Sequence, residues 1–184
     1  MSPILGVIAS GISGNLYTIE PAYDFIAATS PTGTTVSFTS IPQTYKHLRM
    51  HIVGRSSYTA YDQTGNITFN SDTGANYRRR YTLSNGSSTL YPSSASANFS
   101  WALPDFPGSY IDSNNFASGV CEIFDYADTS KITTLSAFGG YPTGGYGQST
   151  GYWNNTAGVT RIDIVISNGN WVSGSHFALY GIKG

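Results

Sequence analysis

Apolar residues along this chain recur mostly at every second position, in short stretches separated by Gly, Pro, Asn and Asp. In the stretch 47–54, Leu48, Met50 and Ile52 share one face of an extended chain, and the intervening histidines and arginine share the other. The stretch 161–167 alternates in the same way. A spacing of three or four residues, kept over a helical length, is rare. The pattern predicts an all-β protein.

Ten stretches combine this pattern with many Val, Ile, Thr, Phe and Tyr residues, and we predict them to be strands: Tyr17–Ala27, Thr34–Ser40, His47–Gly54, Asn66–Phe69, Tyr77–Leu83, Ala97–Trp101, Gly119–Tyr126, Thr133–Phe138, Val159–Ser167 and Ser175–Ile182. Short strands with turns between them are typical of a two-sheet antiparallel β-sandwich, predicted here as one domain over residues 17–184. The weakly patterned stretch Ser84–Asn115 is predicted to be a long excursion that packs through its aromatic residues.

Residues 1–16 form a predicted N-terminal arm. No basic region precedes its apolar stretch, which is shorter than the about 20 residues that a membrane span needs. We therefore expect neither a signal peptide nor membrane insertion. Because an apolar arm needs a surface to cover it, we expect it to contact a neighbouring subunit or its own core through these side chains: Ile4, Leu5, Val7, Ile8, Ile12 and Leu16.

The composition is poor in charge and rich in hydroxyl groups. Charged residues make up 10% of the chain, whereas it has 25 Ser and 20 Thr. Aromatic residues make up 14%, which is typical of a folded β protein and not of a disordered chain. A net charge of −1 provides no basic surface, so we expect no nucleic-acid binding. The single Cys121 excludes an internal disulfide and is predicted to be a small buried strand residue.

Candidate catalytic groups lack the context that catalysis needs. Three histidines occur without a motif that places one of them beside a nucleophilic serine, and no carboxylate pair has support beyond proximity in the sequence. We therefore expect no enzyme and no cofactor. Oxygen ligands around a glycine follow Asp62 and Asp72, but neither segment has the length of an EF-hand loop. We predict ordinary turns at both, and a structural cation remains an open alternative.

Two features point to contacts with other molecules. The run Arg78, Arg79 and Arg80 concentrates a third of the basic residues, and is interpreted as a solvated strand or as a contact with an acidic partner surface. Aromatic residues of the predicted loops, including Tyr58, Tyr61 and Tyr91, can stack on sugar rings or fill a subunit interface. Within this group, the candidate glycan contacts are Tyr141, Tyr146, Tyr152 and Trp153.

Five segments of the chain are distinctive: residues 4–14 and 177–183 at its two ends and, between them, residues 40–48, 69–77 and 153–157. In this order they resemble segments of a group of small virion proteins of tailed bacteriophages. The resemblance implies a non-enzymatic β-sandwich, often of jelly-roll type and trimeric, that serves as a capsid cement or decoration protein or in a neck, tail or fibre assembly.

The short chain has no long fibrous shaft, which favours the decoration role. We therefore expect a homotrimer on the surface of the virion, made in the host cytoplasm and bound to the major capsid protein or another virion protein. The low charge agrees, because interface cores are depleted in Lys, Glu and Asp. The alternative is a neck, tail or fibre component, or a receptor-binding module that recognises host surface glycans through its aromatic loops.

Overall fold

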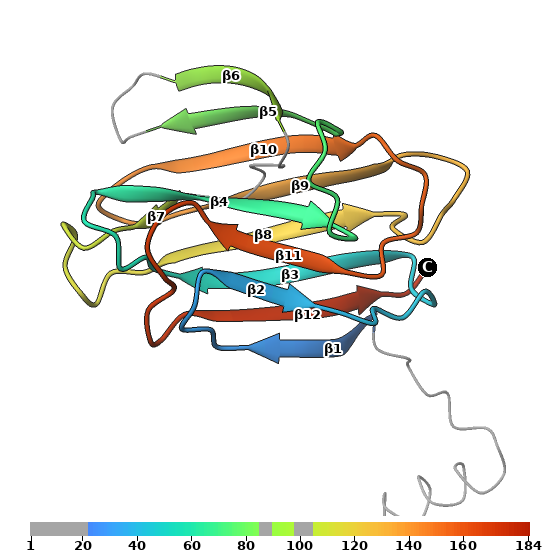
Figure 1. Cartoon of the computed structure of the whole chain (residues 1–184), viewed down its shortest axis with the longest axis horizontal. Coiled ribbons are helices and arrows are strands. Elements are labelled where there is room, and N and C mark those ends of the chain that lie inside the picture. Colours follow the sequence, from blue (N-terminus) through green and yellow to red (C-terminus); the bar gives the residue numbers. More distant parts are fainter. Residues whose placement is uncertain (1–21, 85–89, 98–104) are drawn as a thin grey trace, which may run out of the picture.

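A computed structural model describes residues 22–84, 90–97 and 105–184, so the predicted arm 1–16 lies outside the described residues (Figure 1). The prediction of an all-β protein is confirmed, and every regular element of the described chain is a strand: β1 (Tyr23–Thr29), β2 (Thr35–Phe38), β3 (His47–Gly54), β4 (Asp62–Phe69), β5 (Tyr77–Ser84), β6 (Leu90–Ala97), β7 (Asp105–Pro107), β8 (Ala117–Phe124), β9 (Thr133–Gly140), β10 (Tyr146–Trp153), β11 (Ile162–Ile166) and β12 (His176–Ile182).

The strands form two antiparallel sheets with the connectivity of a jelly roll. β1 pairs with β12 and β3 with β8 in one sheet, while β2 pairs with β11 and β4 with β7 in the other. The first half of the roll thus pairs with the second half in reverse order. Within the roll, the strand order is β1-β12-β3-β8 in one sheet and β2-β11-β4-β7 in the other. This nesting is the double Greek key of a jelly roll, which confirms the predicted fold class.

Four further strands extend one sheet of the roll. β9, β10, β5 and β6 follow β8 in order, so the large sheet has eight strands and the small sheet four (Figure 1). The two hairpins β5–β6 and β9–β10 come from different places in the chain, between β4 and β7 and between β8 and β11. They meet where β5 pairs with β10 along its whole length.

The core lies between the two sheets and is filled by the apolar face of each strand. In β3 the residues Leu48, Met50 and Ile52 are buried, as their alternation predicts. Near one end of the sandwich the ring of Trp171 packs edge-on against two neighbours, with centroid separations of 4.8 Å to Phe106 and 4.9 Å to Phe177. Such aromatic pairs bury large areas in a specific geometry and fix how the sheets stack.

Several predicted boundaries need correction. The strand 47–54 is confirmed to the residue as β3, but Asp62–Asn66, predicted to be a turn, is the first part of β4. Of the predicted strand Ala97–Trp101, Ala97 is the last residue of β6 and residues 98–101 lie outside the described residues. Ser84–Asn115 contributes β6 to the large sheet and β7 to the small one. Its weak apolar pattern reflects the edge positions of both strands.

Candidate interaction surfaces

Four of the connections that pass between the two sheets of the roll gather at one end, on the left of Figure 1, which we call the loop end. They are the segments β1–β2, β3–β4, β7–β8 and β11–β12. Backbone hydrogen bonds join them: Trp171 N donates to Gly33 O at 2.9 Å and Ser57 N to Asn170 O at 2.9 Å. The loop end is therefore one bonded unit made from four segments that are distant in the sequence.

Arg55 is a buried support beneath this end. Its side chain donates from Nη2 to Ile111 O at 2.6 Å and from Nη1 to Asp112 O and Asn115 O at 2.8 and 3.1 Å. The planar guanidinium suits this role because its several N–H groups bond carbonyls in fixed directions. It holds the β7–β8 segment against the start of the β3–β4 segment. Sequence reasoning missed this residue, because nothing near it in the sequence marks its acceptors.

Three exposed tyrosines lie on the surface of the loop end, and we call them the tyrosine cluster. Tyr58 and Tyr61 come from the β3–β4 segment and Tyr110 from the β7–β8 segment, with 43, 68 and 59% of their surface exposed. The rings of Tyr61 and Tyr110 meet edge to face with centroids 5.4 Å apart. Loop aromatics such as Tyr58 and Tyr61 were predicted from the sequence as possible contacts, whereas the pairing of Tyr61 with Tyr110 required the fold.

The backbone beneath the tyrosine cluster is clamped. Tyr58 O accepts hydrogen bonds from the backbone N of Ala60 and of Ser109, at 2.9 and 2.8 Å, and Gly108 N donates to Tyr61 O at 2.9 Å. A Cβ atom at Gly108 would lie 2.3 Å from Ala60 O, so only glycine permits the two segments to approach this closely. The tyrosines are therefore presented on a rigid base.

A second exposed surface is the outer face, meaning the face of the large sheet that points away from the small sheet. Its main feature is the outer-face track, a row across five adjacent strands formed by Phe25, Tyr180, His51, Val120 and Phe138. Ring centroids lie 5.9 Å apart between the first two and 5.0 Å apart between the second and third, and the last three are cross-strand partners. Phe25 and Phe138, at its two ends, are 62 and 61% exposed.

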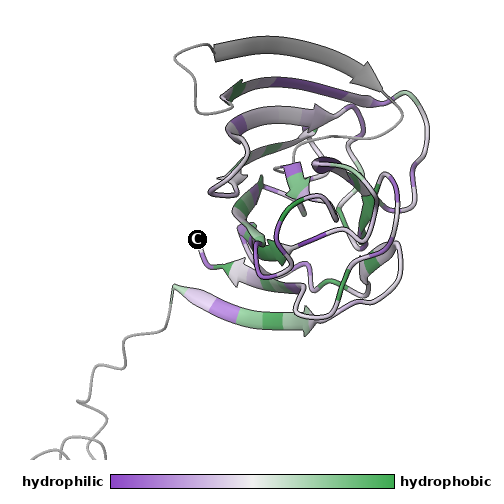
Figure 2. Cartoon of the chain, turned by 90° about the vertical axis from the view of Figure 1, so that its left-hand side faces the viewer, coloured by the Kyte–Doolittle hydropathy of each residue, from purple (hydrophilic) through white to green (hydrophobic). Residues whose placement is uncertain are grey.

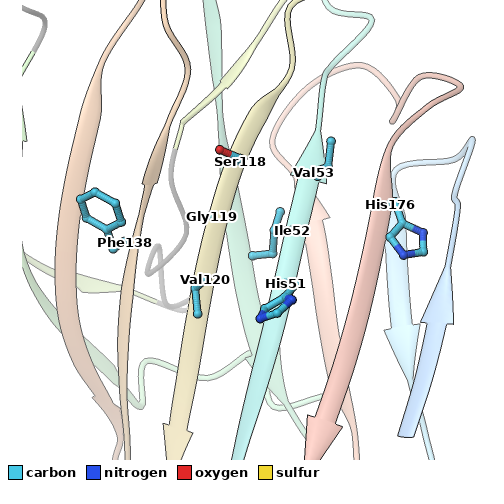
Figure 3. Close-up of a pocket in the computed structure, with 8 residues that line it drawn as sticks. All are labelled: His51, Ile52, Val53, Ser118, Gly119, Val120, Phe138 and His176. Atoms are coloured by element: carbon cyan, nitrogen blue, oxygen red, sulfur yellow. The ribbon is translucent and has the colours of Figure 1, made fainter. Parts of the chain in front are cut away.

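Beside the track lies a shallow depression of about 260 Å³ (Figure 3). Val53 and His176 on neighbouring strands line it together with His51 and Phe138, whereas the Ile52 side chain points into the core. Together with His47, all three histidines of the chain therefore lie on this face. The depression is open, and its lining is mainly apolar.

The charged groups of β3 and β8 on the outer face are paired with one another. Arg49 forms an ion pair with Glu122 across β3 and β8, and its Nη1 donates to the hydroxyl of Tyr23 at 2.8 Å. At the corner of the sheet, hydrogen bonds from Lys131 and Lys46 hold the pKa of Asp125 at about 2. The charged groups next to the outer-face track are therefore neutralised by partners within the same chain.

The residues predicted to contact glycans do not form one site. Tyr146, Tyr152 and Trp153 were predicted to lie in loops, but they lie in strand β10. Trp153 is only 1% exposed, and its Nε1 donates to Asp72 Oδ2 at 2.7 Å. Tyr141 is also buried, which raises the pKa of its hydroxyl to about 12. Tyr146 alone among the four is well exposed, and it projects from the outer face.

The segment after Asp72 is an ordinary turn, as predicted. The two carboxylate oxygens of Asp72 accept from Gly74 N at 2.8 Å, from Asn76 Nδ2 at 2.8 Å and from Trp153 Nε1 at 2.7 Å. These donors, with Trp153 foremost, lower the pKa of Asp72. The carboxylate is thus engaged by N–H groups, and the turn ties the end of β10 to the β4–β5 connection.

The arginine run lies on β5, with its members on different faces. Arg78 and Arg80 are exposed on the outer face, where they stay predicted partner contacts. Arg79 is directed to the inner side, where it is largely buried with its guanidinium 4.0 Å from the ring centroid of Tyr81. Cys121 is buried in β8 as predicted, and burial raises the pKa of its thiol to about 12.

Within 22–84, 90–97 and 105–184, no three His, Cys, Asp or Glu side chains are grouped to hold a metal ion. The described part of the chain also contains no helix long and apolar enough to cross a membrane.

Known proteins with similar sequences or structures do not identify a function for these surfaces. No protein-family model matches the chain, and no curated protein matches it. Among solved structures, the tripod from the baseplate of bacteriophage Tuc2009 is similar over 91% of this chain and 69% of that chain, with 12% sequence identity and a TM-score of 0.33. At that TM-score the likeness carries no argument about fold or function, so the fold is defined here by the strand pairing itself.

Proposed function

We propose that this chain is a non-enzymatic structural protein of a tailed-phage particle, and specifically a capsid cement or decoration protein that associates as a homotrimer. The observation that carries the proposal is the outer-face track, a largely aromatic row across five strands of the large sheet that ends on both sides in an exposed phenylalanine. The resemblance of residues 4–14 and 177–183 to the ends of small virion proteins supports the same conclusion.

Connected exposed apolar surface on a folded protein marks a place where another molecule binds, because leaving it in water is unfavourable. Phe25 and Phe138 are the two large side chains at its ends. Beside it, Arg49 and Glu122 neutralise each other in an ion pair, so a partner need not supply a charged group there. A second copy of the same chain, equally poor in charge, satisfies these conditions.

The N-terminal arm extends this proposal. Residues 1–16 are predominantly apolar and precede β1, which is an edge strand of the large sheet. We propose that the arm contacts a neighbouring copy and that many copies together stabilise the particle surface. Deleting residues 2–16 is then expected to reduce incorporation into virions. Full incorporation of the shortened chain would contradict this role of the arm.

The experiment that tests the proposal is quantitative mass spectrometry of purified virions, with the copy number expressed relative to the major capsid protein. A capsid cement protein is expected at hundreds of copies per particle. Absence from the particle would overturn the proposal.

A second candidate is a neck, tail or fibre component. Its supporting observation is the tyrosine cluster, because an exposed aromatic group at one end of the sandwich is a suitable contact for another surface. A neck, tail or fibre component is expected at a handful to a few dozen copies per particle, so the same measurement separates this role from the cement role.

A further inference from the structure

The tyrosine cluster differs chemically from the outer-face track. Its three rings each carry a hydroxyl group, whereas the track ends in two phenylalanines. Side chains able to form hydrogen bonds surround it on the adjoining loops, as exposed hydroxyl and amide groups of Ser57, Thr59, Ser109, Asn168 and Asn170. Figure 2 looks onto this end, where the loops are mostly pale or purple, hence of intermediate hydropathy or hydrophilic. The surface suits a ligand that is itself both apolar and hydroxylated.

The cluster is also arranged before any ligand arrives. Tyr61 and Tyr110 already contact one another, and the segments that carry them are joined by backbone hydrogen bonds from Gly108 to Tyr61 and from Tyr110 to Ala60, at 2.9 and 3.1 Å. Gly169, at a positive φ of 73°, brings the β11–β12 segment against Tyr58, because a Cβ atom there would lie 2.6 Å from Tyr58 N. A preorganised aromatic surface loses little conformational entropy on binding.

The charges at the loop end restrict the ligand further. Asp62 and Asp112 are exposed there, whereas the nearby Arg55 is buried and its N–H groups donate to three backbone carbonyls. An anionic ligand would meet these two carboxylates without an exposed cation from Arg55 to balance them. The charge pattern therefore disfavours acidic polysaccharides and phosphorylated polymers.

We propose that the tyrosine cluster is a binding site for an uncharged saccharide. The C–H faces of a sugar ring pack on Tyr61 and Tyr110, and the surrounding hydroxyl and amide groups bond its hydroxyls. The surface is open, so one site binds weakly, and several copies on one particle act together by multivalency. This site goes beyond the structural role, which requires no ligand.

The test uses the full chain and defined probes. Binding to dextran, mannan and N-acetylglucosamine oligomers represents the uncharged class, and polygalacturonate and hyaluronate represent the acidic class. Titration calorimetry is expected to detect at least one uncharged probe and neither acidic one. Substituting Tyr61→Ala or Tyr110→Ala is expected to weaken that binding by about tenfold, the usual effect of truncating a central aromatic contact.

The matched control is Tyr146→Ala, which removes an exposed tyrosine from the outer face and none of the three rings of the tyrosine cluster. It is expected to bind as the parent does, and thermal unfolding checks that all three variants are folded. No binding to any uncharged probe, binding to acidic probes alone, or an equal loss in the control would overturn the proposal. None of these results alters the expected copy number in virions, so this inference and the structural role fail independently.

Discussion

At the scale of single residues, buried polar side chains determine how the loop end is built. Arg55 is the clearest case, since its guanidinium replaces the water that three carbonyls of the β7–β8 segment would otherwise bond. A buried carbonyl without a donor costs about 1–3 kcal/mol. One side chain therefore stabilises a segment that has little regular structure of its own.

Replacing Arg55 is expected to destabilise the protein. Arg55→Ala leaves the three carbonyls without their donors, and we expect the free energy of unfolding to fall by about 3 kcal/mol, measured by urea denaturation. The control Arg80→Ala removes an exposed arginine from β5 and is expected to change stability by less than about 0.5 kcal/mol. Equal effects of the two substitutions would contradict the supporting role of Arg55.

Asp105 is a partly buried polar residue, and it opposes stability at neutral pH. Burial on β7, together with the charge of Asp62, raises the pKa of Asp105 to about 6. An unfolded chain has an ordinary Asp pKa of about 3.9. The folded protein thus holds this proton more tightly, so the contribution of Asp105 is fully present below about pH 4 and is lost as the pH rises through about 6.

The Asp105→Asn variant is expected to remove this pH dependence. Asparagine imitates the neutral acid, so at pH 8 the variant should be more stable than the parent by an amount on the order of 2 kcal/mol, while the two converge at pH 4. Denaturant unfolding at a series of pH values measures this. The exposed Asp112→Asn serves as a control. A constant difference between variant and parent at every pH would show that Asp105 does not titrate in this way.

At the scale of elements, close backbone approaches at glycine decide how loops and strands meet. In β12, a Cβ atom at Gly181 would lie 2.3 Å from the ring of Tyr45, so the ring covers the strand there. In the β7–β8 segment, Gly108 allows the contact with the β3–β4 segment. Neither glycine has a positive φ, so the close approach itself is the reason for the residue.

Adding a methyl group at Gly108 is expected to separate the two segments. In Gly108→Ala the new Cβ atom would lie 2.3 Å from Ala60 O and 2.9 Å from Tyr58 O, and these backbone atoms must move. We expect a loss of about 1–3 kcal/mol in the free energy of unfolding. Gly33→Ala, at a position with no atom within 4 Å, is the matched control and should be neutral. A neutral Gly108→Ala would disprove the tight clamp.

Element prediction from the sequence succeeded where one face is core and the other is solvent. β3 was predicted to the residue because Leu48, Met50 and Ile52 alternate with polar residues. β10 was missed because its residues include Gly147 and Gly151 and show no apolar alternation. The strand is held in the sheet by hydrogen bonds to its neighbours β9 and β5. Pairing between distant strands leaves no mark on such a local pattern.

At the scale of the whole molecule, the extension of one sheet sets how the protein can associate. The small sheet has four strands and the large sheet eight, so the outer face is wider than the sandwich beneath it. The outer-face track runs from Phe25 on β1 to Phe138 on β9 across this face. Association through the face would bury these rings without changing the core.

Polar substitution at the two ends of the track is expected to prevent self-association. The double variant Phe25→Ser and Phe138→Ser removes two exposed rings, so the chain should remain folded while its mass by light scattering falls to that of one copy. Tyr61→Ser, at the loop end, is the control and should leave the mass unchanged. A parent chain that is a single copy at every concentration would contradict association through this face.

The sequence by itself determined the all-β class, the burial of Cys121 and the turn at Asp72, because each follows from a local pattern or from the chemistry of a single residue type. Only the tertiary structure decided which aromatic residues meet. Trp153 is buried against the Asp72 turn, whereas Tyr61 and Tyr110 are brought together on the surface. The physical reason is that strand pairing and loop clamping act between distant residues, and hydropathy along the chain does not record them.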